Sequence, residues 1–294
     1  MAKNVEFDDG NKLPIPEFCV DEMCINPSVV MIAKRGSGKS WVTRAVLQKF
    51  KDIPVGLILS PTEQDNPFYS GFFPDTYIHY EYKSNILQKL LYRQRMMIKK
   101  AKEKKEQGKY VDPRAIIVMD DCLASKGAWA KDPPIHDLLF NGRHRQIMYI
   151  LTMQFPLGIK PELRSNFDYI FLLADDQVSN LKRIYDHYAG MFPDFHFFRQ
   201  VFKQLTDDFG AMVIKNRGAR GSLFDKIAFY KAPDLSKTKM DFGCSQLRAY
   251  DRMNYDKDWE EKKFAVNYED SLLNVKKKEK ISVKRVFKED LPQI

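Results

Sequence analysis

The stretch Ser28-Val29-Val30-Met31-Ile32-Ala33-Lys34-Arg35-Gly36-Ser37-Gly38-Lys39-Ser40 decides the fold of this chain. Its first half is apolar and rich in β-branched residues, which predicts a buried strand, and the pattern from Trp41 to Leu47 predicts a helix. The loop between them ends in Gly-Lys-Ser. A strand, such a loop and a helix in this order predict a phosphate loop, whose backbone N–H groups and helix N-terminus surround a triphosphate.

Each position of this loop is therefore a candidate nucleotide-binding residue. Lys39 can reach the β- and γ-phosphates of a nucleotide, and the Ser40 hydroxyl can ligate Mg²⁺. Ala33 stands where the strict pattern has Gly, and Ala is the smallest side chain that can replace it. A glycine-rich turn between two core elements is the alternative, but it leaves the Lys-Ser pair unexplained. The candidate set is Ala33, Lys34, Arg35, Gly36, Ser37, Gly38, Lys39 and Ser40.

A second motif places two acids after an apolar run, in Ala115-Ile116-Ile117-Val118-Met119-Asp120-Asp121. The run predicts a strand buried on both faces of a parallel sheet, with both acids at its carboxyl end, where open α/β sheets bind ligands. We assign Asp120 to the Mg²⁺ shell and Asp121 to the base that orients the attacking water. Neighbouring side chains on a strand point in opposite directions, so we expect the two carboxylates to diverge. The alternative is that they only cap the next turn.

A third apolar run, 146–153, predicts another strand, and the amide of Gln154 follows it. If this strand lies between the first two, Gln154 faces the γ-phosphate and can hold the water or sense the phosphate. A loop residue without such a role is the alternative.

These motifs resemble the DNA-packaging ATPases of nucleo-cytoplasmic large DNA viruses, the poxvirus-type branch of the FtsK/HerA superfamily. The resemblance covers about residues 13–232 and rests on the loop, the acidic strand, Thr152-Met153-Gln154, Asn141-Gly142-Arg143-His144-Arg145 and 161–169. It departs from the superfamily at Ala33 and in Asp-Asp, where Asp-Glu is usual. It implies an α/β P-loop NTPase of the additional-strand, RecA/FtsK-HerA-like type, with a mostly parallel central sheet flanked by helices. We expect antiparallel strands at one edge.

The resemblance also implies a homo-oligomeric ring that hydrolyses ATP with Mg²⁺ and moves viral double-stranded DNA into a capsid, with capsid or portal-site proteins as further partners. Such motors use a cation, often an arginine from the next subunit, against the charge on the γ-phosphate. Arg164 is our first candidate and Arg143 the second, ahead of Arg145. For each arginine a surface salt bridge is the alternative. His144 is either a phosphate contact or a surface residue.

The composition of the chain is compatible with a DNA-packaging ATPase but does not by itself indicate one. The 294 residues are 44% apolar, and the net charge of +9 suits a polyanionic partner, although a solvated basic surface is the alternative. The four cysteines form no metal-ligand pattern, and we expect all of them to be reduced. No hydrophobic stretch approaches membrane-spanning length. We therefore expect the protein in the viral factory of the host cytoplasm, and also in the virion.

Along the chain, we expect an extended lead-in over 1–24, the ATPase domain over 25–232 and a charged, partly helical or disordered extension over 233–294. A long helix over 85–107 has a basic second half, which either faces DNA or is simply solvated. Further strands are expected over 53–60, 77–82, 169–174, 211–216 and 226–231, and further helices over 135–141, 176–188 and 192–205.

Two other functions remain open at this stage. One is a phosphotransferase that uses the same loop on a small molecule, although the sequence shows no lid-like arginine cluster for an acceptor. The other is a protein that binds ATP as a switch without hydrolysing it, which the intact Asp120-Asp121 pair and Gln154 disfavour.

Overall fold

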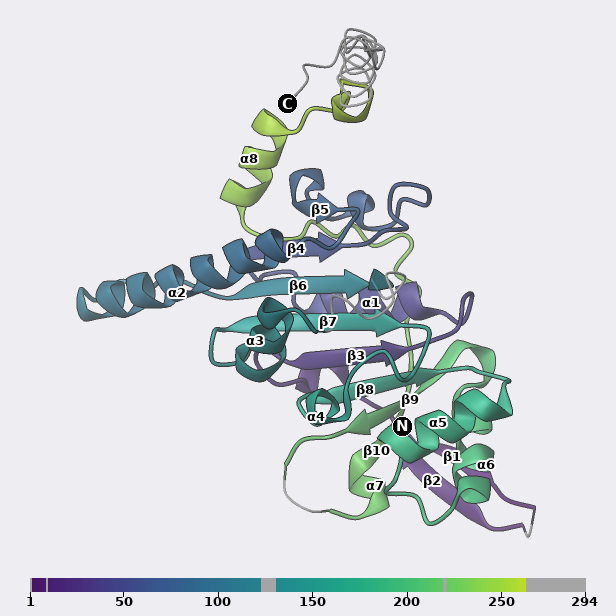
Figure 1. Ribbon diagram of the computed structural model, residues 1–294. Coiled ribbons are helices and arrows are strands. Elements are labelled where there is room, and N and C mark those ends of the chain that lie inside the picture. Colours follow the sequence, from purple (N-terminus) through teal and green to yellow (C-terminus); the bar gives the residue numbers. More distant parts are fainter. Residues whose placement is uncertain (1, 9, 123–130, 219–220, 263–294) are drawn as a thin grey trace, which may run out of the picture. The chain divides into compact units, whose positions relative to one another are not determined.

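The computed structural model describes residues 2–8, 10–122, 131–218 and 221–262. Its contacts divide the chain into one unit over Met1–Arg252 and a second over Met253–Ile294. None of the described helices is long and apolar enough to cross a membrane. The fold of the first unit is α/β, with a mostly parallel central sheet flanked by helices (Figure 1).

The central sheet has eight strands in the order β10-β9-β8-β3-β7-β6-β4-β5. The strands from β8 to β5 are parallel, whereas β9 at one edge pairs antiparallel with both β8 and β10, so antiparallel pairing is present at one edge, as the sequence predicted. The bounds are β3 Ser28–Ile32, β4 Val55–Leu59, β5 Ile78–His79, β6 Ala115–Asp120, β7 Ile147–Met153, β8 Tyr169–Leu173, β9 Gly210–Lys215 and β10 Ile227–Lys231.

Strand alternation divides the core between the two faces of this sheet. In β3, Val30 and Ile32 join the cluster that packs under α2, α3, α5 and α6, while Val29 and Met31 join the cluster under α1. Both clusters consist of buried apolar residues, so the middle strands are apolar on both faces, as is usual for parallel strands covered by helices. The helices are α1 Lys39–Lys49, α2 Ser84–Glu106, α3 Pro133–Asn141, α4 Pro161–Arg164, α5 Val178–Tyr188, α6 Phe195–Leu205, α7 Leu223–Lys226 and α8 Ser245–Asn254.

The first 24 residues contain a β-hairpin, β1 Ala2–Glu6 with β2 Lys12–Pro16. The hairpin packs on α6, where the Phe7 and Phe197 rings stack with centroids 4.8 Å apart, and Gln204 bonds the backbone of Glu6. The lead-in is thus tied to the domain by its own small sheet.

Short 3-10 helices lie at η1 Val20–Glu22, η2 Tyr69–Gly71, η3 Asp75–Tyr77 and η6 Asp207–Phe209.

Residues 233–252, which we had expected in the C-terminal extension, belong to the first unit. Phe242 is fully buried, and its ring stacks on that of Phe73 with centroids 4.7 Å apart. Both rings lie over Gly56 of β4, where a Cβ atom would come within 2.5 Å of Phe73 and 2.9 Å of Phe242. Gly56 therefore allows this segment to close over the edge of the sheet. The lysine run at 276–280 lies outside the described residues.

Candidate nucleotide site

The segment 33–38, our predicted phosphate loop, connects the buried strand β3 to helix α1, so the predicted order of strand, loop and helix is present. The Ala33 N–H donates to the Met153 carbonyl at 3.0 Å, which joins the start of the loop to the end of β7. Gly36 and Gly38 have φ of 77° and 95°, a left-handed conformation that glycine adopts without cost. Ala33 is almost fully buried, so its methyl group lies in the core and leaves the rest of the loop open.

The loop presents donors that have no partner within the described part of the chain. The N–H groups of Gly36, Gly38 and Lys39 donate to no oxygen of the described residues. A Cβ atom built on Gly36 meets nothing within 4 Å, so the space in front of the loop is open. Ser37 and Lys34 brace the loop from within, since the Ser37 hydroxyl donates to the Lys34 carbonyl at 2.8 Å. Unpaired N–H groups at a helix N-terminus make a site for an anion such as a phosphate.

The two predicted carboxylates meet the ammonium group of Lys39. Lys39 Nζ lies 3.0 Å from Asp120 Oδ1 and also pairs with Asp121 Oδ2. Our expectation that the carboxylates diverge is therefore wrong. The reason is the backbone of Asp121, whose φ of 49° leaves the strand path and turns the side chain back toward Lys39. A non-glycine residue in this conformation is uncommon and often marks a functional site.

Neighbouring strands fix both acids. Strand β7 lies between β3 and β6, as we had supposed for the Gln154 strand. The Thr152 hydroxyl donates to Asp120 Oδ1 and accepts from the Asp121 N–H at 3.1 Å. Gln154 Nε2 donates to Asp121 Oδ2 at 3.1 Å. The structure thus brings Lys39, Asp120, Asp121 and Gln154 together at the carboxyl edge of the sheet.

This arrangement suits a hard divalent cation. Two carboxylates and one ammonium leave a local charge of −1, and Asp121 Oδ1 is buried without a hydrogen-bond partner among the described residues. Oxygen ligands of this kind are those that Mg²⁺ prefers. Ser40, at the start of α1, supplies a hydroxyl beside Lys39, and the next residue, Trp41, has 47% of its surface exposed.

Sequence reasoning missed a tyrosine that lies against the acids. Tyr69, in η2, is almost fully buried, and its pKa is raised well above the usual range by burial first and then by the charge of Asp120. Glu63 holds the turn that carries it, since one carboxylate oxygen accepts the N–H groups of Phe68 and Ser70 at 2.9 Å each. The cluster of aromatic residues at 68–73 was the available signal, but nothing in it indicated which ring faces the site.

Cys122 closes the site on the core side. Burial, followed by the charges of Asp120 and Asp121, raises the pKa of its thiol to about 12. The thiol therefore stays protonated and donates to the Leu59 carbonyl. All four cysteines are free thiols, as expected.

Arg164, our first candidate for a cation acting on a neighbouring subunit, is packed inside its own chain. Its side chain is buried, Nε donates to the Ile159 carbonyl at 2.9 Å, and the guanidinium lies 5.5 Å from the centre of the Tyr188 ring. These contacts leave little of the side chain for another subunit, so the structure does not support that choice. Arg145 is likewise paired within the chain, with Asp137.

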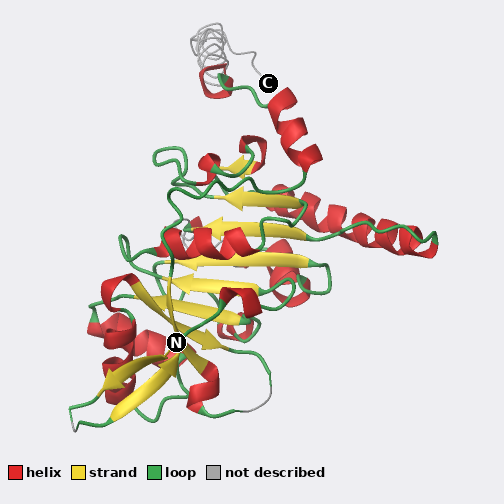
Figure 2. Ribbon diagram, turned by 180° about the vertical axis from the view of Figure 1, so that it is seen from behind, coloured by secondary structure: helices red, strands yellow, loops and turns green. Residues whose placement is uncertain are grey.

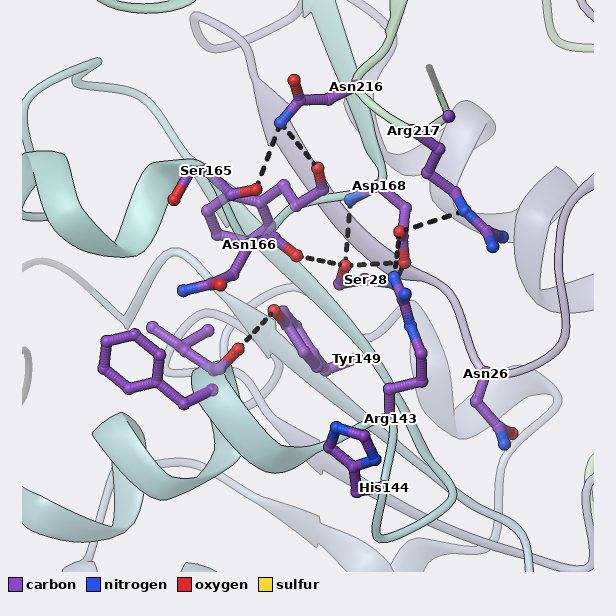
Figure 3. A pocket seen from close by; sticks show the side chains of 14 residues that line it. Asn26, Ser28, Arg143, His144, Tyr149, Ser165, Asn166, Asp168, Asn216 and Arg217 are labelled. Atoms are coloured by element: carbon purple, nitrogen blue, oxygen red, sulfur yellow. Dashed lines mark hydrogen bonds and ion pairs between the residues drawn. The ribbon is translucent and has the colours of Figure 1, made fainter.

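Arg143 lies at the opposite, amino-terminal edge of the sheet, in a pocket of about 380 Å³ (Figure 3). It pairs with Asp168, which is buried, while about half of the Arg143 side chain is exposed. Arg217 approaches the same carboxylate oxygen to 3.4 Å. The other oxygen of Asp168 accepts the N–H of Ser28 at 2.9 Å and its hydroxyl at 2.8 Å. This pairing raises the pKa of Arg143.

The pocket presents a basic rim to the outside. His144 lines it beside Arg143, and Asn166 Nδ2 is buried there without a partner among the described residues. Arg143 and the phosphate loop of its own chain lie at opposite ends of β3, because Arg143 pairs with Asp168 beside Ser28 whereas the loop follows Ile32.

The chain is similar to a family model, to several viral proteins and to a solved structure. The family model described as "Poxvirus A32 protein" matches residues 17–188. An uncharacterized protein of Acanthamoeba polyphaga mimivirus is 44% identical over 269 residues, which cover 91% of this chain and 94% of that protein. An uncharacterized protein of Invertebrate iridescent virus 6 is 34% identical over 229 residues, 77% of this chain and 85% of that protein. Among solved structures, B204, the DNA-packaging ATPase from Sulfolobus Turreted Icosahedral Virus, is 18% identical over 71% of this chain and 99% of that chain, with a TM-score of 0.49.

Proposed function

The chain belongs to the Poxvirus A32 protein family, and from that premise we propose that it is a Mg²⁺-dependent ATPase motor that moves viral double-stranded DNA into the capsid. The observation that carries the proposal is the meeting of Lys39, Asp120, Asp121 and Gln154 in front of an open phosphate loop. A phosphate loop alone would serve many activities. The acid–amide pair beside it is what hydrolysis of the γ-phosphate needs.

The roles of the residues follow from their positions. The loop N–H groups and Lys39 bind the β- and γ-phosphates, for which Lys39 exchanges its carboxylate partners for phosphate oxygens. Ser40 and Asp120 would hold Mg²⁺, which when bound would neutralise charge on the phosphates. Thr152 keeps Asp120 in its orientation.

Asp121 is the base in the hydrolytic step. A water oxygen attacks the γ-phosphorus, the bond from that phosphorus to the β–γ bridging oxygen breaks, and the water proton passes to Asp121. ADP leaves with the bonding electrons, and inorganic phosphate is the second product. Gln154, which donates to Asp121 in the structure, orients the carboxylate and the water. The chain contributes positioning and charge rather than covalent chemistry.

We propose that the active form is a homo-oligomeric ring in which Arg143 of one copy faces the nucleotide of the next. Arg143 is preferred to Arg164 because its side chain is half-exposed and Arg164 is buried. DNA and capsid or portal-site proteins are the proposed partners, and the viral factory in the host cytoplasm and the virion are the proposed locations. The net charge of +9 supports a polyanionic partner.

The test is ATP hydrolysis by the purified full chain, with and without long double-stranded DNA, over a series of salt concentrations. We expect stimulation by DNA that fades steeply as salt rises, since phosphate contacts release counterions. The Lys39→Ala variant, which should not hydrolyse ATP, is the control for contaminating activity. Hydrolysis that ignores DNA, phosphate transfer to a small acceptor, or tight ATP binding without turnover in any oligomer would each refute the motor.

A further inference from the structure

The distal part of α2 is strongly basic. We call residues 95–109 the basic arm; it holds seven basic and two acidic residues. The first part of the helix is anchored in the core by Leu87, Leu90, Leu91 and Gln94, whereas none of the residues from Arg95 to Lys109 is buried. The anchor and the arm are thus two halves of one helix with different surroundings.

The arm projects beyond the amino-terminal ends of the strands, on the side of the sheet opposite to the phosphate loop (Figures 1 and 2). At 1.5 Å per residue, its helical part of 12 residues, Arg95 to Glu106, extends for about 18 Å. Along a DNA duplex the same length carries about ten phosphate charges, at one per 1.7 Å of axis. The arm is long enough to follow several phosphates at once.

Few carboxylates among the described residues neutralise these charges. Arg95 approaches Asp137 at 3.8 Å and Lys99 approaches Glu103 at 3.9 Å, both at the outer limit for ion pairs. In the described part of the chain no carboxylate pairs with the four exposed lysines Lys100, Lys102, Lys105 and Lys109. Lysines spaced three or four residues apart on a helix repel each other by a few tenths of a kcal/mol per pair. The arm therefore carries a repulsion that an external polyanion would relieve.

The distribution of the basic side chains around the arm indicates which class of partner it would bind. At 100° per residue, the basic side chains point to all sides of the helix, so they offer a charged rod rather than one shaped face. The apolar residues of the arm end at Ala101, so its outer half has no stripe to insert into a membrane. A second copy of this chain carries the same net charge of +9, so the two copies repel each other overall. A uniform line of phosphates matches such a rod.

We propose that the basic arm binds the phosphate backbone of double-stranded DNA, without reading its sequence. The proposal rests on the proposed function for its biological sense, because a motor needs a surface that holds DNA apart from the nucleotide site. The proposal assigns DNA binding to a particular surface of the chain, which the proposed mechanism of hydrolysis does not do. The binding itself can be measured with no nucleotide present.

The test replaces the four unpaired lysines by glutamine, in K100Q/K102Q/K105Q/K109Q of the full chain, and measures equilibrium binding to a short DNA duplex over a salt series. Glutamine has nearly the helix propensity of lysine, so α2 should persist. We expect weaker binding at every salt concentration. The slope of log affinity against log salt should become shallower by about 0.9 for each lysine that contacts a phosphate.

A matched control removes four lysines elsewhere, in K12Q/K182Q/K237Q/K239Q, which changes the net charge equally at exposed positions. This variant should keep the wild-type slope, and so should arginine at the four arm positions. The proposal is overturned if the control lowers the slope as much as the arm variant does. It is also overturned if the arm variant binds DNA like wild type but loses self-association or binding to anionic vesicles.

The outcome can be separated from that of the proposed function. Basal ATP hydrolysis without DNA should be the same in wild type and in the arm variant, because the arm projects beyond the amino-terminal ends of the strands, whereas Lys39 begins α1 and Asp120 ends β6 at their carboxyl ends. If ATP hydrolysis by the wild type is not stimulated by DNA, the proposed motor function is refuted. The dependence of DNA affinity on salt then still decides whether the arm binds DNA.

Discussion

At the scale of single residues, one ammonium group, that of Lys39, compensates two acids that are themselves largely buried. Only 10% of the Asp120 side chain and 16% of the Asp121 side chain are exposed. When an ionised group in such a place loses its partner, the cost is larger than the net value of the pair, because the charge stays desolvated. Stability and the proposed catalysis are therefore expected to depend on the same side chain.

We expect Lys39→Ala to abolish ATP turnover and to lower the free energy of unfolding by about 3 kcal/mol. Mg²⁺ should raise the melting temperature of this variant more than that of wild type, since a cation then binds between two uncompensated carboxylates. Thermal denaturation with and without Mg²⁺ measures this. Lys34→Ala, which breaks only an exposed pair with Asp176, is the control and should cost less than about 1 kcal/mol. An equal Mg²⁺ effect in wild type and Lys39→Ala would contradict the prediction.

Asp121→Asn should bind ATP about as well as wild type but lose turnover, by about a hundredfold or more, because the amide cannot accept the water proton. Nucleotide titration and single-turnover hydrolysis separate the two effects. Asp176→Asn, at an exposed position beside the loop, is the matched control. Normal turnover by Asp121→Asn would remove Asp121 from the role of base.

At the scale of elements, the sequence predicted the strands whose apolar runs end in a motif. β3, β6, β7 and β8 lie where expected, because buried parallel strands show as continuous apolar runs. The region 77–82 became a strand only at Ile78–His79, at the outer edge of the sheet, where half of the ladder is unpaired. The hairpin within 1–24 was not predicted, since the two prolines in Lys12–Pro16 are typical of loops or of edge strands.

The candidate site was predicted in its parts but not in its contacts. Lys39, Asp120, Asp121 and Gln154 are found together because each follows a strand of the same parallel sheet. The left-handed backbone of Asp121 has no local sequence signal, and the positions of Tyr69 and Arg164 depend on tertiary packing. The hydrophobic pattern of the sequence thus could not predict in which direction a side chain points at the end of a strand.

Closure of the segment 233–252 over β4 gives a prediction about packing. Gly56→Ala should lower the free energy of unfolding by about 1–3 kcal/mol, since the added methyl group meets Phe73, Ile116 and Phe242 within 3 Å. Gly71→Ala is the matched control, because a Cβ atom there meets nothing within 4 Å. Denaturant titration measures both. Equal stability of the two variants would show that the core relaxes around Gly56.

At the scale of the whole molecule, the sheet separates the candidate nucleotide site from the Arg143 pocket. The phosphate loop and the acids lie at the carboxyl edge, and the Arg143 pocket lies at the amino edge. Asp168 has two arginine partners, so Arg143 can leave it while Arg217 continues to compensate the buried carboxylate. In a ring, the amino edge of one copy can face the carboxyl edge of the next.

Subunit mixing tests this arrangement. Arg143→Ala alone should lower kcat by about a thousandfold or more, as removal of an arginine acting between subunits does. A mixture of Arg143→Ala and Lys39→Ala subunits should recover activity, because an intact loop then meets an intact Arg143 across some interfaces. Arg145→Ala, which breaks a pair within the chain, should not show this complementation. A mixture that stays inactive would refute action in trans.

The exposed indole of Trp41 gives the chain an optical reporter of its own. It follows Ser40 directly, and its ring is about half open to solvent, so a change at the phosphate loop should alter its emission. The chain has three tryptophans, and comparison with Trp41→Phe would assign the signal to this one. Nucleotide arrival and departure could then be followed in real time, in stopped flow, without a labelled substrate.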